Sequence, residues 1–143
     1  MTESTEKKMM INRRTYNSFI EALDIVDIRL VSAKVENIDC NYVPENAEVK
    51  WSESARYENA QNKIMIFHKF NVRILEGGKD IKAKIGVTFC VSYDSKKPMT
   101  DALFEIFRDR NLPVNSWPYF REFLHSVVLR MGWPPFIAPT FVA

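Results

Sequence analysis

Apolar residues recur with two different periods along the chain, and the change of period divides it into elements. From Arg13 to Leu23 they follow a helical spacing, which predicts a short amphipathic helix. From Val26 onward apolar and polar residues alternate, which predicts a strand. The alternation slips by one residue at Leu30 and Val31, and we expect a β-bulge there to absorb the extra residue.

Three further stretches of alternation predict strands at 47–57, 64–74 and 81–93. Gly77 and Gly78 separate the last two and predict a two-residue hairpin turn. Such a turn pairs Ile74 with Ile81, Val72 with Ala83, Phe70 with Ile85, Ile66 with Phe89 and Ile64 with Val91. This register puts both apolar sets on one face, so the sheet needs a single covering layer.

The covering layer is predicted at 116–131. Ser116 can cap the start of a helix, and Pro118 is tolerated just inside it. Gly132 and the prolines after it end the helix, and an apolar arm follows at 136–141. We expect the apolar stripe of this helix to close the sheet or to form an interface between subunits. The stripe consists of Phe120, Phe123, Leu124, Val127, Val128 and Met131.

The crossover between the fourth strand and this helix is too long for a plain loop. Thr100 or Asp101 can cap a short helix in it that runs to Arg110. The predicted fold class is therefore α+β: a four-stranded antiparallel sheet covered on one face by the C-terminal helix, with a short N-terminal helix and a helical crossover. We expect one domain over 1–143, with a flexible tail at 1–12.

Composition narrows the class of protein. The chain is 46% apolar and 27% charged, as globular proteins are, and a net charge of +2 does not call for nucleic acid. It has neither an apolar run long enough to enter a membrane nor a signal-type N-terminus, so we expect a cytoplasmic protein. Cys40 and Cys90 form no CxxC motif, and we expect two reduced thiols that act as small apolar fillers.

Motifs for catalysis, phosphate binding or metal binding are missing from the sequence. His68 and His125 lack ligands at metal spacing, and Glu122 lacks a second carboxylate for acid–base catalysis. We therefore expect no enzyme, no cofactor and no metal. Two alternatives stay open: a pocket protein or enzyme in which sheet and helix enclose a small ligand beside His68, and a plain oligomerisation module.

Aromatic residues are concentrated after the fourth strand, in greater number than a domain of this size must bury. Those that flank the ends of the predicted helix beside prolines, such as Trp117 and Trp133, fit a groove or a subunit contact as well as a core.

The segment from Trp117 to Phe141 resembles the signature of SecB-type protein-export chaperones. In that family an aromatic residue and a proline lead into Tyr-x-Arg-Glu, a helix follows, and Gly-x-x-Pro precedes an apolar arm. The matching residues are Pro118, Tyr119, Arg121, Glu122, Gly132, Pro135, Pro139 and Phe141. The predicted order of strands and crossover from Val26 onward also agrees with the family.

The resemblance implies a cytosolic, ATP-independent holdase that assembles as a dimer of dimers, a homotetramer, and binds unfolded client polypeptides in apolar grooves before export. The apolar stripe of the long helix then becomes the expected oligomer interface, and Trp133→Ala should weaken client binding more than it lowers the melting temperature. The expected client-binding residues are Phe104, Phe107, Trp117, Tyr119, Trp133, Phe136 and Ile137.

Two differences from the family favour a dedicated partner over general export. Typical members continue into a zinc-binding tail that docks on the export motor ATPase, whereas this sequence stops at Ala143. The family also has acidic residues on the exposed sheet face, where this chain offers Lys79, Lys82 and Lys84. The antitoxin of a toxin–antitoxin pair is such a partner.

Overall fold

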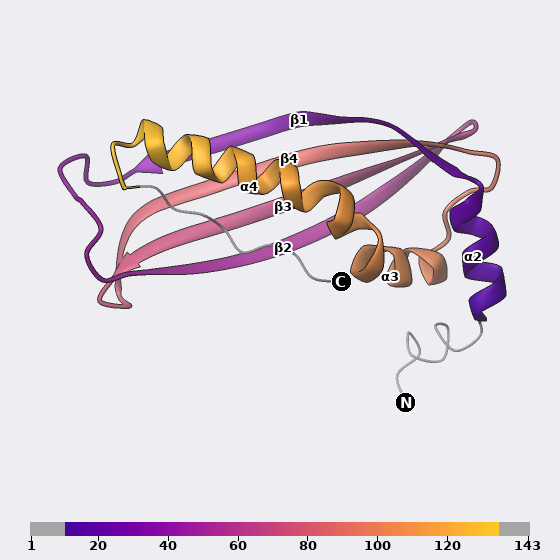
Figure 1. Cartoon of the computed structure of the whole chain (residues 1–143), viewed down its shortest axis with the longest axis horizontal. Coiled ribbons are helices and arrows are strands. Elements are labelled where there is room, and N and C mark those ends of the chain that lie inside the picture. The colour runs from indigo at the N-terminus through magenta and orange to yellow at the C-terminus, as the bar shows by residue number, and fades with distance from the viewer. Residues whose placement is uncertain (1–10, 135–143) are drawn as a thin grey trace.

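A computed structural model describes residues 11–134 and shows a long, twisted antiparallel sheet with helices on one face (Figure 1). In chain order the elements are α2 (Arg13–Glu21), β1 (Leu23–Asn37), β2 (Ala47–Ala60), β3 (Lys63–Glu76), β4 (Asp80–Ser95), α3 (Asp101–Arg110) and α4 (Leu112–Arg130). The strand order is β1-β4-β3-β2, so β1 and β2 are the edges. The α+β architecture predicted from the sequence is confirmed. The predicted tail at 1–12 lies mostly outside the described residues.

The β3–β4 hairpin has a different register from the predicted one. Ile74 pairs with Ala83 instead of Ile81, and each predicted pair is displaced by two residues. The turn is longer than expected, because Glu76 pairs with Asp80, and a bulge after Ile74 adds one more residue. A shift of two residues keeps the side chains from Ile64 to Ile74 and from Ala83 to Tyr93 on their predicted face, so these apolar sets still coincide. Ile81, beyond the bulge, pairs with Leu75 instead.

The predicted bulge in β1 is confirmed. The register with β4 shifts between Leu30 and Ser32, which leaves Val31 without a direct partner. A second shift between Ile25 and Asp27 was not predicted. Bulges increase the local twist of a strand, and both lie on an edge strand, where they are most common.

The start of α4 corrects the sequence prediction. The helix begins at Leu112, with Pro113 in its first turn, and only Asn111 separates it from α3. Ser116 therefore lies inside the helix and is not its cap; its hydroxyl donates to the Leu112 carbonyl at 3.0 Å. Pro118 lies in the helix interior. The prediction failed because Pro113 favours a helical start as well as Pro118 does.

Two apolar clusters form the core on the helix-facing side of the sheet. In the first, α4 packs on β3 and β4, and the rings of Phe70 and Phe120 stack with centroids 4.3 Å apart. In the second, α2 and α3 cover the other end of the same strands, with Phe19 and Phe107 almost fully buried. Cys90 is buried as expected, but Cys40 is exposed in the β1–β2 loop and fills no core position.

Candidate functional site

Most of the aromatic residues expected to bind clients lie inside the single chain. Phe104, Phe107, Trp117 and Trp133 are each less than 10% exposed and belong to the two core clusters. Tyr119 is 49% exposed. Phe136 and Ile137 lie outside the described residues. Of the expected residues that the structure describes, only Tyr119 therefore offers a large free surface.

The apolar stripe of α4 divides into a buried and a half-buried part. Phe120, Leu124 and Val128 are at most 2% exposed and close the sheet of their own chain. The partly buried residues Phe123, Val127 and Met131 pack against the same cluster. Only these three have side-chain surface left for a contact with another subunit.

Edge strand β1 carries an exposed apolar surface that the sequence pattern did not reveal. Its members are 41–55% exposed: Ile25, Val26, Leu30 and Val35. Leu30 pairs with Phe89 of β4, whose ring lies 6.3 Å from Tyr119 and 6.4 Å from Phe123 between centroids. The exposed residues of β1 therefore continue into the near side of α4. We refer to these four β1 residues together with Tyr119 and Phe123 as the β1 surface.

The other edge of the sheet differs in character. β2 reads AEVKWSESARYENA, and its charged residues protect it against unwanted strand pairing. β1, in contrast, is 15 residues long, pairs with β4 on one side only, and exposes large apolar side chains. Natural proteins usually cover such an edge or use it as an interface.

Trp51 is the large apolar exception on β2. Its side chain is 50% exposed, and its ring centroid lies 5.0 Å from that of the buried Trp117. Trp117 in turn packs on Phe120 at 5.3 Å and on Phe70 at 6.1 Å. An exposed aromatic ring is thus held in place by the core beneath it. We call Trp51 with its floor Trp117 the Trp51 site.

The alternation in the sequence places Trp51 on the correct face of the sheet but does not predict that its side chain is exposed. Trp51 alternates with polar neighbours and pairs with Val72, so the pattern assigns it to the apolar face of the sheet. It lies on that face, but at the edge, where α4 does not cover it fully. Strand order, which alternation does not specify, decides its exposure.

His68 is a buried polar link between sheet and helix. It is 2% exposed, with Nδ1 2.7 Å from the Ser116 hydroxyl and Nε2 3.2 Å from the Glu53 carboxylate. Its ring also packs on Phe70 at a centroid distance of 4.1 Å. Both ring nitrogens have protein partners, which explains why a histidine stands in an otherwise apolar row. A structural role for His68 accounts for these contacts without a ligand.

The loop between β1 and β2 is fastened to the end of α4. The Tyr42 hydroxyl donates to Glu76, and its ring meets Trp133 edge-on with centroids 5.7 Å apart. Desolvation, together with the hydrogen bond to Glu76, raises the pKa of Tyr42 to about 12. Trp133 is therefore covered by Tyr42 of the same chain, in a contact that the sequence pattern did not reveal.

Within residues 11–134 no three His, Cys, Asp or Glu side chains come together as a metal site. None of the helices in that range is both long and apolar enough to cross a membrane.

Comparison with solved structures identifies the fold. A SecB-like chaperone of Mycobacterium tuberculosis, solved in complex with a ChAD peptide from an antitoxin, superposes with a TM-score of 0.80. The match covers 92% of this chain and 99% of that one at 14% identity. A Streptococcus agalactiae protein of unknown function matches with a TM-score of 0.53 at 10% identity, over 82% of this chain and 97% of its own. No family model and no curated protein matches the sequence. The chain thus has the SecB-like fold.

Proposed function

We propose that this chain, with its SecB-like fold, is an ATP-independent cytoplasmic holdase that binds unfolded or aggregation-prone polypeptides. The observation that carries the proposal is the exposed apolar surface on both edges of the sheet, in the β1 surface and at the Trp51 site. Monomeric soluble proteins rarely leave such surface uncovered without a binding role. The superposition with a SecB-like chaperone bound to a peptide supports the same function.

The two surfaces suit two different occupants. The β1 surface lies on a strand with one free side and includes the half-buried Phe123 of α4. Large apolar surfaces of this kind are typical of permanent subunit contacts. We therefore assign the β1 surface to homo-oligomerisation, as a dimer that pairs further into a tetramer with the outer sides of Val127 and Met131 contributing.

The Trp51 site suits a client. A single exposed ring on a rigid floor offers an apolar anchor to many different side chains. One buried aromatic anchor contributes about 1.5–3 kcal/mol. Equivalent sites on several subunits would add through effective concentration along one unfolded chain. Affinity then arises without a strict sequence code.

Only the comparison supports a particular class of client. The Mycobacterium tuberculosis protein of the same fold was solved with an antitoxin peptide. We propose that this chain likewise serves an aggregation-prone partner such as an antitoxin, and that general export through the motor ATPase is the less favoured use.

The test is suppression of aggregation. Several chemically unfolded client proteins are diluted into buffer with and without stoichiometric amounts of the purified chain, in the absence of ATP, and light scattering is recorded. We expect scattering to fall in proportion to the chain added, whereas an inert globular protein of similar mass leaves it unchanged. Equal scattering with and without the chain, for every client, would remove the proposal.

A further inference from the structure

The face of the sheet turned away from the helices carries basic side chains around a hollow of about 680 Å³. All four strands contribute to its lining, and each contributes at least one exposed cation. These cations are Lys34, Lys50, Lys69, Arg73 and Lys84. Glu36 is the one acidic residue among those that line the hollow. A hydrogen bond from Lys34 holds the pKa of the Glu36 carboxyl below its usual value.

The register brings three of these cations into one row. Arg73 of β3 pairs with Lys50 of β2 on one side and with Lys84 of β4 on the other. Neighbouring strands lie about 4.7–4.9 Å apart, and like charges directly opposite one another destabilise a sheet. Glu36 of β1 pairs with Lys84 at one end of the row, whereas within the described residues no salt bridge joins Lys50 or Arg73 to an acid. The fold thus tolerates a local repulsion that a bound anion would relieve.

The hollow beside this row exists because one position lacks a side chain. Gly86 lies between Lys34 of β1 and Asn71 of β3 in the next row of the sheet. A Cβ atom at Gly86 would come within 3.3 Å of the Asn71 Oδ1 atom, so a larger residue would crowd the floor. Backbone and amide groups therefore remain accessible between the cations.

A second hollow adjoins the first and is more apolar. Val31, the bulged residue of β1, and Phe67 of β3 both line it. The Arg56 guanidinium covers the Phe67 ring at 4.1 Å from its centroid. Lys69 and Thr88 line both hollows, which makes the two continuous.

Of the three lysines that the sequence offered for this face, only Lys84 belongs to the cluster. Lys82 is the extra residue of the β4 bulge and lies 3.8 Å from Asp39, near the Tyr42 ring. Lys79 lies in the β3–β4 turn. The face is nevertheless basic, because the other strands supply cations that only the register brings together.

We propose that this outer face binds an acidic polypeptide segment with an apolar side chain at one end. The cations would pair with carboxylates, and the neighbouring hollow would take the apolar group. Single-stranded nucleic acid fits less well, because the Arg56 guanidinium covers the Phe67 ring that lines the apolar hollow and leaves it no open face for base stacking. The net charge of +2 is also low for a nucleic-acid protein.

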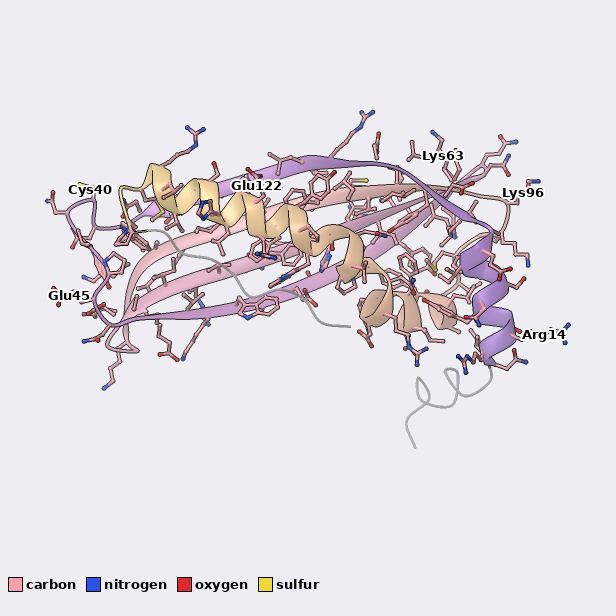
Figure 2. All side chains as sticks on the ribbon, viewed as in Figure 1. Arg14, Cys40, Glu45, Lys63, Lys96 and Glu122 are labelled. Atoms are coloured by element: carbon pink, nitrogen blue, oxygen red, sulfur yellow. The ribbon has the colours of Figure 1, made fainter. Side chains whose placement is uncertain are left out.

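The test measures fluorescence anisotropy of a labelled octaglutamate peptide ending in leucine. The double variant Arg73→Glu/Lys84→Glu is compared with Lys63→Glu/Lys96→Glu, which makes the same change in net charge at the other end of the sheet, as Figure 2 shows for Lys63 and Lys96. We expect the first variant to bind about tenfold or more weakly and the second to bind like the original chain. High salt should weaken binding by the original chain.

Three results would overturn the proposal. The peptide does not bind the original chain, or both variants lose affinity equally, which would indicate an effect of net charge alone. An oligothymidine probe that binds more tightly than the peptide and depends on Arg73 and Lys84 would assign the face to nucleic acid instead. All four mutated side chains are exposed, so both variants should remain folded, which circular dichroism can verify.

Discussion

At the scale of single residues, Trp117 and Trp133 show how burial changes a functional expectation. Both are 6% exposed and pack in the cluster beneath α4. Trp→Ala substitutions at such positions typically cost about 3–5 kcal/mol because they leave a cavity. We therefore expect Trp117→Ala and Trp133→Ala to lower the free energy of unfolding strongly in urea titrations. If Trp133→Ala lost client binding while its melting temperature stayed unchanged, Trp133 would belong to the client site after all.

Tyrosines at the junction of the helices predict a loss of stability at high pH. Burial raises the pKa of Tyr93 and of Tyr16 to about 12, above the ordinary value near 10. The Tyr16 hydroxyl donates to Asn111, and Asn115 donates to the Tyr93 hydroxyl at 2.7 Å. A pKa that is higher in the folded state means that stability is full below pH 10 and is lost as the pH rises toward about 12.

The measurement is the free energy of unfolding against pH, together with the near-ultraviolet absorbance of tyrosinate. We expect a plateau up to about pH 9 and a decline above it, with tyrosinate appearing late in the folded protein. Tyr93→Phe should make the decline shallower. A stability that stays constant to pH 12, or tyrosinate that appears fully at pH 10, would contradict the assigned environments.

At the scale of elements, the sequence predicted faces better than positions. In β3 up to Ile74 and in β4 from Ala83 onward, the alternation placed the side chains on the correct face, yet the register was wrong because a bulge after Ile74 and the longer turn are invisible to a period of two. In β1 the bulge at Val31 was found because it breaks the alternation itself. The exposure of Trp51 could not be predicted, since it depends on which strand lies at the edge.

Helix α4 contains a proline at a position where it weakens the helix. Pro118 lies in the interior of α4 and lacks the backbone N–H that would donate to the Val114 carbonyl. Its side chain is exposed, so it adds no buried packing in return. A proline in a helix interior typically costs about 3 kcal/mol relative to alanine. We expect Pro118→Ala to recover part of this cost and to raise the free energy of unfolding by about 1 kcal/mol or more. Thermal unfolding measures the change.

Glu122→Ala provides the control for this prediction. Glu122 is exposed on the outer side of the same helix (Figure 2), so its removal should change stability by no more than about 0.5 kcal/mol. If Pro118→Ala destabilises the protein, the proline must contribute a contact that its exposure does not indicate.

At the scale of the whole molecule, the β1 surface predicts an oligomer. The variant Leu30→Asp/Val35→Asp places two charges where we expect another subunit, and buried unpaired charges weaken an interface strongly. Native mass spectrometry should show the original chain as a dimer or tetramer and this variant as a monomer with an unchanged circular dichroism spectrum. Val43→Asp, at an exposed loop position, should leave the assembly intact.

A monomeric original chain would contradict the assignment of the β1 surface to subunit contact and would leave that surface free for clients. Dissociation of the Val43→Asp variant would show that the effect is not specific to β1.

We propose that an exposed tryptophan on a rigid floor holds unfolded chains, and the affinity of Trp51→Ala for a labelled, permanently unfolded client measures its contribution. The Trp51 ring is half exposed, so its removal should change the melting temperature little. We expect Trp51→Ala to bind the client about tenfold or more weakly than the original chain, because an aromatic anchor is truncated. Val43→Ala should bind like the original chain. Equal client affinity of Trp51→Ala and the original chain would show that Trp51 is not the client anchor.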